Sequence, residues 1–229
     1  MEVLASYTWA KYLDTNSGNE GWAGTGSGFA ENFYDLRNEK SLDGDDIPQS
    51  LVVSYIYQLP FGHGRHFATS LHGPAEAILG GWQISGITTL KSGIPLAFSA
   101  PGYSFAEGQR PNVTCNPSLG NPTLTEWFDT SCLVKPAPYT FGQASRYMDV
   151  RAPDMQNWDI AMEKWTNLTH KYESLRLEFR AEMFNAFNHE NFFRPDSGVG
   201  DPLFGHVNSS VNGGGLPARD IQFALKLFF

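Results

Sequence analysis

The stretch LRLEFRAEM, from Leu175 to Met183, alternates strictly between apolar and charged side chains. A period of two is that of a β-strand, in which successive side chains point to opposite faces of a sheet. In a helix, residues four apart are neighbours, so the two arginines would lie side by side and the two glutamates likewise, and such like-charge pairs are destabilising. The stretch therefore predicts a strand with one apolar and one charged face. The charged face consists of Arg176, Glu178, Arg180 and Glu182.

Five other segments alternate in the same way and predict further strands. They are residues 3–9, 51–59, 82–99, 157–163 and 221–229. The segment 82–99 contains Gly86 and Gly93, and its sequence does not show which of its faces is apolar. The short turn 166–172 predicts that the strands on either side of it form an antiparallel hairpin. The chain is therefore predicted to be all-β, with six antiparallel strands.

The connections between these strands alternate in length. Residues 14–45, 100–155 and 188–217 are long and rich in Gly, Asn, Asp, Ser and Pro, whereas 166–172 is short and 62–80 is intermediate. Loops above about 15 residues are uncommon in compact soluble domains. Here they occur at every second connection, which places all three at the same end of the sheet. Outer-membrane β-barrels have long loops outside and short turns on the periplasmic side. The pattern predicts an antiparallel transmembrane β-barrel wall, present as an open curved sheet.

The composition limits the possible classes further. Charged residues make up 17% of the chain, against about 25% in an average soluble domain, while aromatic residues make up 14%. This balance argues against disorder, and 23 glycines with 14 prolines argue against a mainly helical fold. The net charge is -8 and no cluster of Lys or Arg is present, so nucleic acid is not expected as a partner.

Cys115 and Cys132 lie together in one Pro-, Asn- and Ser-rich stretch. Two thiols in a loop, far from any CxxC or Cys/His cluster, favour a loop-closing disulfide over a metal site. Free thiols remain the alternative. A disulfide would favour an oxidising compartment.

Six blocks of sequence occur in order and are spread through nearly the whole chain. They are SYTWAKYLD (6–14), DIPQSLVVSYIYQLPFGHGRHF (46–67), ILGGWQISGITTLKSGIPL (78–96), NWDIAMEKW (157–165), RLEFRAEMFNAFNHENF (176–192) and RDIQFALKLFF (219–229). Together they resemble the C-terminal part of TonB-dependent outer-membrane receptors, and within these the Oar-like group with a carboxypeptidase-regulatory-like domain upstream.

The resemblance implies active uptake of a ligand across the bacterial outer membrane. In that family the energy comes from TonB, which acts on an N-terminal plug domain, and the barrel closes with about 22 strands. Residues 1–229 are then expected to be the C-terminal part of the barrel domain, with the plug absent from this chain. The expected partners are outer-membrane lipid, the barrel assembly machinery, an unidentified ligand, and TonB only through the plug. No cofactor is expected.

The resemblance also assigns roles to particular residues. The alternating apolar side chains at the end of the chain resemble the C-terminal signal that the assembly machinery recognises; they are Ile221, Phe223, Leu225, Leu227 and Phe229. The charged face of 175–183 is expected to face the barrel lumen. It could contact the plug or a passing ligand, or it could form a hydrated ladder with polar residues of the partner strand. Those residues are Asn157, Asp159 and Glu163.

Catalytic and metal sites are weaker interpretations of this sequence. Glu178 and Glu182 would lie roughly 13 Å apart along a strand, at about 3.3 Å per residue, which is too far for a glycosidase pair. We therefore expect no enzyme. Histidines 63, 66 and 72 lie in a Gly-rich connection, and a solvated turn is favoured over a metal site there. Asp43, Asp45 and Asp46 suggest a calcium loop, but no downstream Glu completes an EF-hand.

A secreted β-sandwich module that binds carbohydrate is the alternative function. It would also consist of antiparallel strands rich in aromatic residues. The two hypotheses differ in where the apolar faces lie: a sandwich buries them between two stacked sheets, whereas a barrel wall exposes them to lipid.

Overall fold

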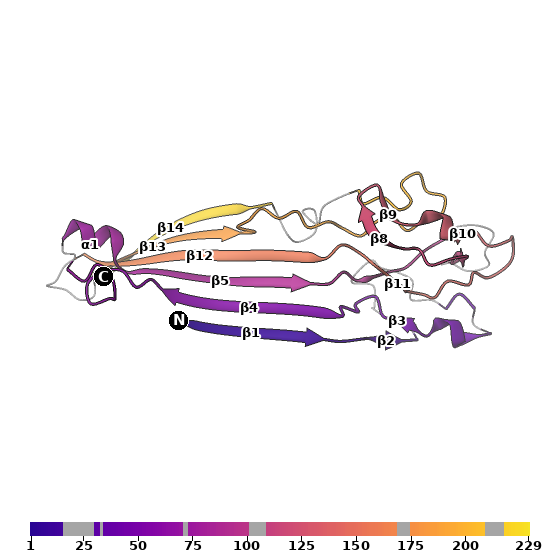
Figure 1. Cartoon of the computed structure of the whole chain (residues 1–229), viewed down its shortest axis with the longest axis horizontal. Coiled ribbons are helices and arrows are strands. Elements are labelled where there is room, and N and C mark those ends of the chain that lie inside the picture. The colour runs from indigo at the N-terminus through magenta and orange to yellow at the C-terminus, as the bar shows by residue number, and fades with distance from the viewer. Residues whose placement is uncertain (16–29, 33, 71–72, 101–108, 169–174, 209–217) are drawn as a thin grey trace.

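The structure is a computed structural model that describes residues 1–15, 30–32, 34–70, 73–100, 109–168, 175–208 and 218–229. Its main feature is one six-stranded sheet in which every strand is antiparallel to its neighbour (Figure 1). In order across the sheet, the strands are β1 (Glu2–Trp9), β4 (Gln49–Gln58), β5 (Trp82–Lys91), β12 (Met155–Asn167), β13 (Arg176–Phe184) and β14 (Asp220–Phe228). The predicted all-β class, antiparallel pairing and six strands are confirmed.

The strand register divides the sheet into two faces, because directly paired residues of antiparallel strands share a face. Met162 pairs with Ala181 and with Ile84, and Ala181 pairs with Phe223, so these positions lie on one side. We call this side the apolar face. On β12, β13 and β14 it carries Trp158, Ile160, Met162, Leu177, Phe179, Ala181, Met183, Ile221, Phe223, Leu225 and Leu227.

The opposite side, here the polar face, holds the charged residues of β13. On the six strands it carries among others Ser6, Ser54, Gln83, Thr89, Asp159, Glu163, Arg176, Glu178, Arg180, Glu182 and Lys226. The register also places several apolar side chains there. They are Leu4, Val52, Ile56, Ile87, Met155, Ala161, Trp165, Phe184, Ala224 and Phe228.

The apolar face is open to its surroundings. Phe223 is 71% exposed and Leu225 is 67% exposed. The other sheets formed by the described residues are two-stranded and belong to the connections, so none of them stacks on this face. The β-sandwich alternative requires these side chains to be buried between two sheets, and it is therefore wrong.

Three long connections lie at the same end of the sheet, as predicted (Figure 1). They span residues 10–48, 92–154 and 185–219, and we call the described parts of these ranges the long connections. The opposite end holds α1 (Pro74–Leu79), between β4 and β5, and the turn between β12 and β13. Most of that predicted turn, from 169 to 172, lies outside the described residues.

Short elements give the long connections their own structure. The first contains β2 (Leu13–Asp14), the 3-10 helix η1 (Leu36–Glu39) and β3 (Ser41–Leu42). The second contains β6 (Pro95–Leu96), β7 (Asn112–Val113), β8 (Ser118–Thr123), β9 (Glu126–Phe128), the 3-10 helix η2 (Thr130–Cys132), β10 (Leu133–Val134) and β11 (Met148–Arg151). Within the chain that the structure describes, the buried hydrophobic cluster lies here and not in the large sheet. It consists of Leu96, Phe98, Ala100, Phe128, Leu133, Val150, Ala152 and Val199.

The predicted strand 82–99 is too long. β5 ends at Lys91, and beyond it the chain passes so close to its neighbour that a side chain at Gly93 would collide with the carbonyl of Ala152. The extended run resumes at β6, which pairs with β11 and not with a strand of the large sheet. The second long connection therefore begins at residue 92 and not at 100. By contrast, β12 is longer than the predicted 157–163 at both ends.

Candidate functional site

The predicted charged ladder on β13 lies on the polar face, and two of its members, Arg180 and Glu182, take part in ion pairs. Nη2 of Arg180 lies 2.7 Å from Oε1 of Glu182, and Nη1 lies 3.5 Å from Oε1 of Glu163 on β12. The other carboxylate oxygen of Glu163 accepts a hydrogen bond of 3.3 Å from the side chain of Gln83 on β5. One arginine thus joins two carboxylates, and the chain of polar contacts crosses three strands.

The remaining two members of the ladder have different neighbours. Glu178 is only 6% exposed and stands between Trp165 on β12 and Lys226 on β14 in the register. Arg176 lies over the ring of Trp165, with its guanidinium carbon 5.6 Å from the ring centroid. A cation at this distance from an aromatic face is attracted by the ring quadrupole.

The predicted pairing of this ladder across the hairpin is correct for Glu163 and wrong for Asn157 and Asp159. The β12–β13 pairing ends at Ile160 and Met183, so the two polar residues lie beyond it. They are opposite β5, where Asn157 pairs with Thr89. Asp159 instead accepts hydrogen bonds from the backbone N–H of Asn185 at 3.0 Å and from the side chain of Asn157 at 3.0 Å.

A hollow of about 410 Å³ lies beside the ladder on the polar face. Its lining combines apolar side chains with charged ones, among them Leu4, Ile56, Ile87, Glu2, Arg180 and Glu182. Leu4, Ile56 and Ile87 are 70%, 44% and 50% exposed, so this apolar surface is accessible. The hollow could bind a ligand group that is part apolar and part charged. The sequence did not reveal it, because each strand contributes one apolar residue among polar neighbours.

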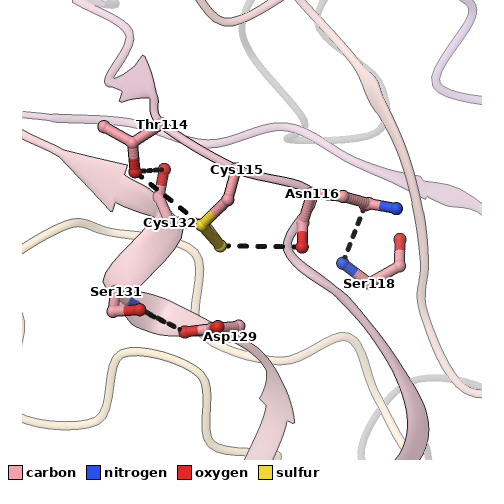
Figure 2. The surroundings of a disulfide bond; sticks show 7 residues. All are labelled: Thr114, Cys115, Asn116, Ser118, Asp129, Ser131 and Cys132. Atoms are coloured by element: carbon pink, nitrogen blue, oxygen red, sulfur yellow. Dashed lines mark hydrogen bonds between the residues drawn. A yellow bond between two sulfur atoms is a disulfide. The ribbon is translucent and has the colours of Figure 1, made fainter.

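The long connections form a packed unit that is closed by a disulfide. Cys115 and Cys132 are joined, and their Cα atoms lie 4.9 Å apart (Figure 2). The bond links the segment after β7 to η2, directly beside the ladder in which Val113 pairs with Leu133. Thr114 strengthens the same junction, because its backbone N–H donates to the carbonyl of Cys132 at 2.8 Å.

Buried and partly buried ion pairs join the first long connection to the second. They are Glu39 with Arg110, Asp14 with Arg146, and Asp46 with Arg151. In addition, one carboxylate oxygen of Glu31 accepts hydrogen bonds from the backbone N–H groups of Arg110 and Gly142, at 2.9 and 3.0 Å. Burial lowers the pKa of the Arg146 guanidinium. The sequence did not reveal these pairs, because about 70 to 130 residues separate the partners and no local pattern connects them.

The metal interpretations find little support in the part of the chain that is described. The carboxylate of Asp46 already has partners within the protein, since it forms an ion pair with Arg151 and accepts a hydrogen bond from the backbone N–H of Tyr12. Asp43 accepts from the backbone N–H of Asp45. His63 and His66 are exposed, and His72 lies outside the described residues. Cys115, Asp129 and Cys132 lie close enough to share an ion, but the two sulfurs are bonded to each other.

The predicted C-terminal signal is an edge strand. β14 pairs with β13 along one side only, and its residues Ile221, Phe223, Leu225 and Leu227 lie on the apolar face. Phe229 follows the strand and is 95% exposed. Phe228 points to the polar face, where its ring lies 5.5 Å from that of Trp165.

The model of a family described as outer membrane beta barrel domain matches residues 1–222. Searches of curated proteins and of solved structures find no match to this chain. Among the described residues, no helix has the length and apolarity needed to cross a membrane.

Proposed function

The chain belongs to the outer membrane beta barrel domain family, and from this premise we propose that its six-stranded sheet is part of the wall of a TonB-dependent receptor. The family places the chain in the bacterial outer membrane. In the proposed receptor the apolar face contacts lipid and the polar face lines the lumen. The long connections lie outside the cell, since outer-membrane barrels keep their long loops there.

The free edges of the sheet support a larger barrel. β1 and β14 are the outermost strands, and each pairs on one side only. Inside a bilayer an unpaired backbone N–H or C=O costs several kcal/mol, so a membrane sheet must close on itself. We propose that further strands complete the wall, to the roughly 22 of the receptors that this sequence resembles.

The observation that carries the uptake proposal is the arrangement of the polar face. A ladder of ion-paired charged side chains adjoins a hollow with an apolar floor, and a packed unit of long connections stands at the end of the same strands. A ligand that enters from outside would meet first the long connections and then this surface. The proposed role is binding and passage of a ligand, with energy supplied through TonB and a plug domain.

We propose no catalytic role for the polar face. Glu182 is engaged by Arg180, and Glu178 stands two strand positions away from it on the same face. These two carboxylates do not converge on a common point, as an acid and a base acting on one bond must.

Uptake can be tested by comparing three bacterial strains: the parent, one without the gene for this protein, and one without TonB. Solutes removed from the medium are measured by mass spectrometry. At least one solute should be removed by the parent and by neither deletion strain. The full-length variant Arg180→Gln should remove it more slowly, whereas Arg37→Gln, on the exposed surface of η1, should remove it as the parent protein does. A solute profile that is unchanged without the gene, or that depends on the gene and not on TonB, contradicts the proposal.

A further inference from the structure

The connection between β4 and β5 is the unusual part of the end opposite the long connections. It contains α1, which is placed at this end of the sheet in Figure 1. The backbone carbonyls at the end of a helix have no partner within the helix and must find one elsewhere. The groups that bind the carbonyls at the end of α1 show on which side of the sheet the end of the helix lies.

Two side chains of the apolar face hold the end of α1. Trp82 and Lys164 are paired in the register, and the ring of Trp82 packs edge-on against Phe179 of the same face, with centroids 6.2 Å apart. The indole N–H of Trp82 donates to the carbonyl of Ile78 at 2.9 Å. The Lys164 ammonium donates to the carbonyl of Gly80 and lies 5.2 Å from the centroid of the Trp82 ring. The end of α1 therefore lies on the apolar-face side of the sheet.

The residues at the end of α1 are apolar and uncovered. Ile78 is 67% exposed and Leu79 is 53% exposed. The single charge within the helix, Glu76, is directed at the connection itself, where its carboxylate accepts from the backbone N–H of His63 at 2.9 Å. The exposed apolar pair thus continues the apolar face beyond the end of the strands.

We propose that α1 is an interfacial anchor: it lies in the headgroup region of the inner leaflet of the outer membrane, with Ile78 and Leu79 against the acyl chains of phospholipid. The periplasmic side follows from the orientation of outer-membrane barrels, whose short connections lie there. We propose lipid as the partner of this surface because the end of α1 lies on the side of the apolar face, which contacts lipid in the proposed receptor. The two capped carbonyls fit this location, since backbone groups close to hydrocarbon need partners within the protein.

The charge distribution fits the same location. Lys164 is the only charged residue on the apolar-face positions of β12, and it lies near the end of the strand that approaches α1. A lysine there can bury its hydrocarbon stem against Trp82 while its ammonium stays at the interface. A tryptophan at the same level is typical of the aromatic belts of membrane proteins.

The test measures the depth of nitroxide labels in the full-length protein, reconstituted in vesicles of phosphatidylethanolamine and phosphatidylglycerol. Labels are attached to the variants Ile78→Cys and Leu79→Cys, while the native cysteines stay protected as a disulfide. Arg65→Cys, exposed in the same connection, is the aqueous control, and Leu225→Cys is the lipid control. Collisions with oxygen, which concentrates in lipid, are compared with collisions with a water-soluble nickel chelate.

The ratio of oxygen to nickel collisions at residues 78 and 79 should be several-fold higher than at residue 65, and close to that at residue 225. A ratio equal to that at residue 65 places α1 in water and overturns the proposal. Low collision rates with both reagents mean that another part of the protein covers the helix, which also overturns it. If either variant fails to assemble, Ala77→Cys gives the same measurement from the neighbouring position. The result does not depend on uptake, so it stands or falls separately from the receptor proposal.

Discussion

Arg110 and Glu39 are 71 residues apart in the sequence, yet Nη2 of Arg110 lies 2.5 Å from Oε2 of Glu39, and neither side chain is more than 4% exposed. This ion pair joins the first long connection to the second. Removing one partner of a buried pair leaves an uncompensated charge in the interior, which is far more costly than losing an exposed pair.

Glu39→Leu should therefore destabilise the long connections by about 3 to 5 kcal/mol. Hydrogen exchange of the backbone N–H groups of Arg110 and Gly142 provides the measurement, because both groups are bonded to Glu31 beside the pair. Both amides should exchange faster. The double variant Glu39→Leu/Arg110→Met removes both charges together and should recover much of the protection.

An exposed pair in the same helix is the matched control. Arg37 and Asp35 are joined at 2.9 Å on the surface of η1, where the hydrogen bonds from Arg37 lower the pKa of the Asp35 carboxyl. Water screens this pair, so Arg37→Met should leave the exchange rates unchanged. If Arg37→Met and Glu39→Leu change the exchange rates equally, burial does not make the Arg110–Glu39 pair stronger than the exposed pair.

Removal of the disulfide should loosen the long connections without opening the sheet. A cross-link that closes a loop of about 15 residues contributes roughly 3 kcal/mol in the chain-entropy model. The variant Cys115→Ser/Cys132→Ser should thus be cut faster by protease within residues 92–154, and reduction of the parent protein should have the same effect. The gel migration of the folded barrel should not change. Equal cutting rates in the parent and the variant would contradict this.

The two faces of β14 can be compared at adjacent positions. Leu225 lies on the apolar face and Ala224 on the polar face. Leu225→Lys places a charge against hydrocarbon and should lower the free energy of unfolding in lipid vesicles by about 1 kcal/mol or more, since the cost of a lysine rises from the interface to about 2 to 4 kcal/mol at the bilayer midplane. Ala224→Lys places the same charge toward the lumen and should cost much less. If the two variants lose the same free energy of unfolding, the apolar face does not contact lipid in preference to the polar face.

Deletion of Phe229 separates assembly from stability. The side chain is 95% exposed and follows the last paired residue of β14, so its loss should leave the free energy of unfolding almost unchanged. If it belongs to the signal that the assembly machinery recognises, the amount of full-length protein in the outer membrane should fall sharply. Phe229→Tyr keeps an aromatic terminus and should preserve that amount. An unchanged amount after the deletion refutes the assembly role.

The sequence predicted the large sheet well, because its strands are long and their two faces meet different surroundings. Leu177 and Glu178 show this: one lies on the apolar face and the other on the polar face, so the alternation is visible within a few residues. The direction of each strand followed from the order of the strands and the alternating length of the connections, whereas the residue register did not: Asn157 and Asp159 lie beyond the β12–β13 pairing. Here a local pattern and the global fold agree.

The unit formed by the long connections could not be predicted in the same way. Phe98 and Phe128 pack with ring centroids 5.0 Å apart, but they come from different segments. Phe98 lies in the predicted stretch 82–99, whose apolar face the sequence does not show, and Phe128 lies in one of the predicted loops. Strands of two residues, such as β6 and β10, are too short to show any period. Asp46 and Arg151 likewise share no sequence pattern, and only the fold brings them together.

The packing of the long connections also determines which surfaces an antibody can bind on intact cells. In the proposed orientation these connections face outward, and ion pairs and a disulfide hold described parts of the first and second connections together. An epitope on them therefore combines segments that are distant in the chain. Antisera raised against single peptides from these connections should bind intact cells poorly, whereas antisera raised against the folded protein should bind them well and lose much of that binding after reduction.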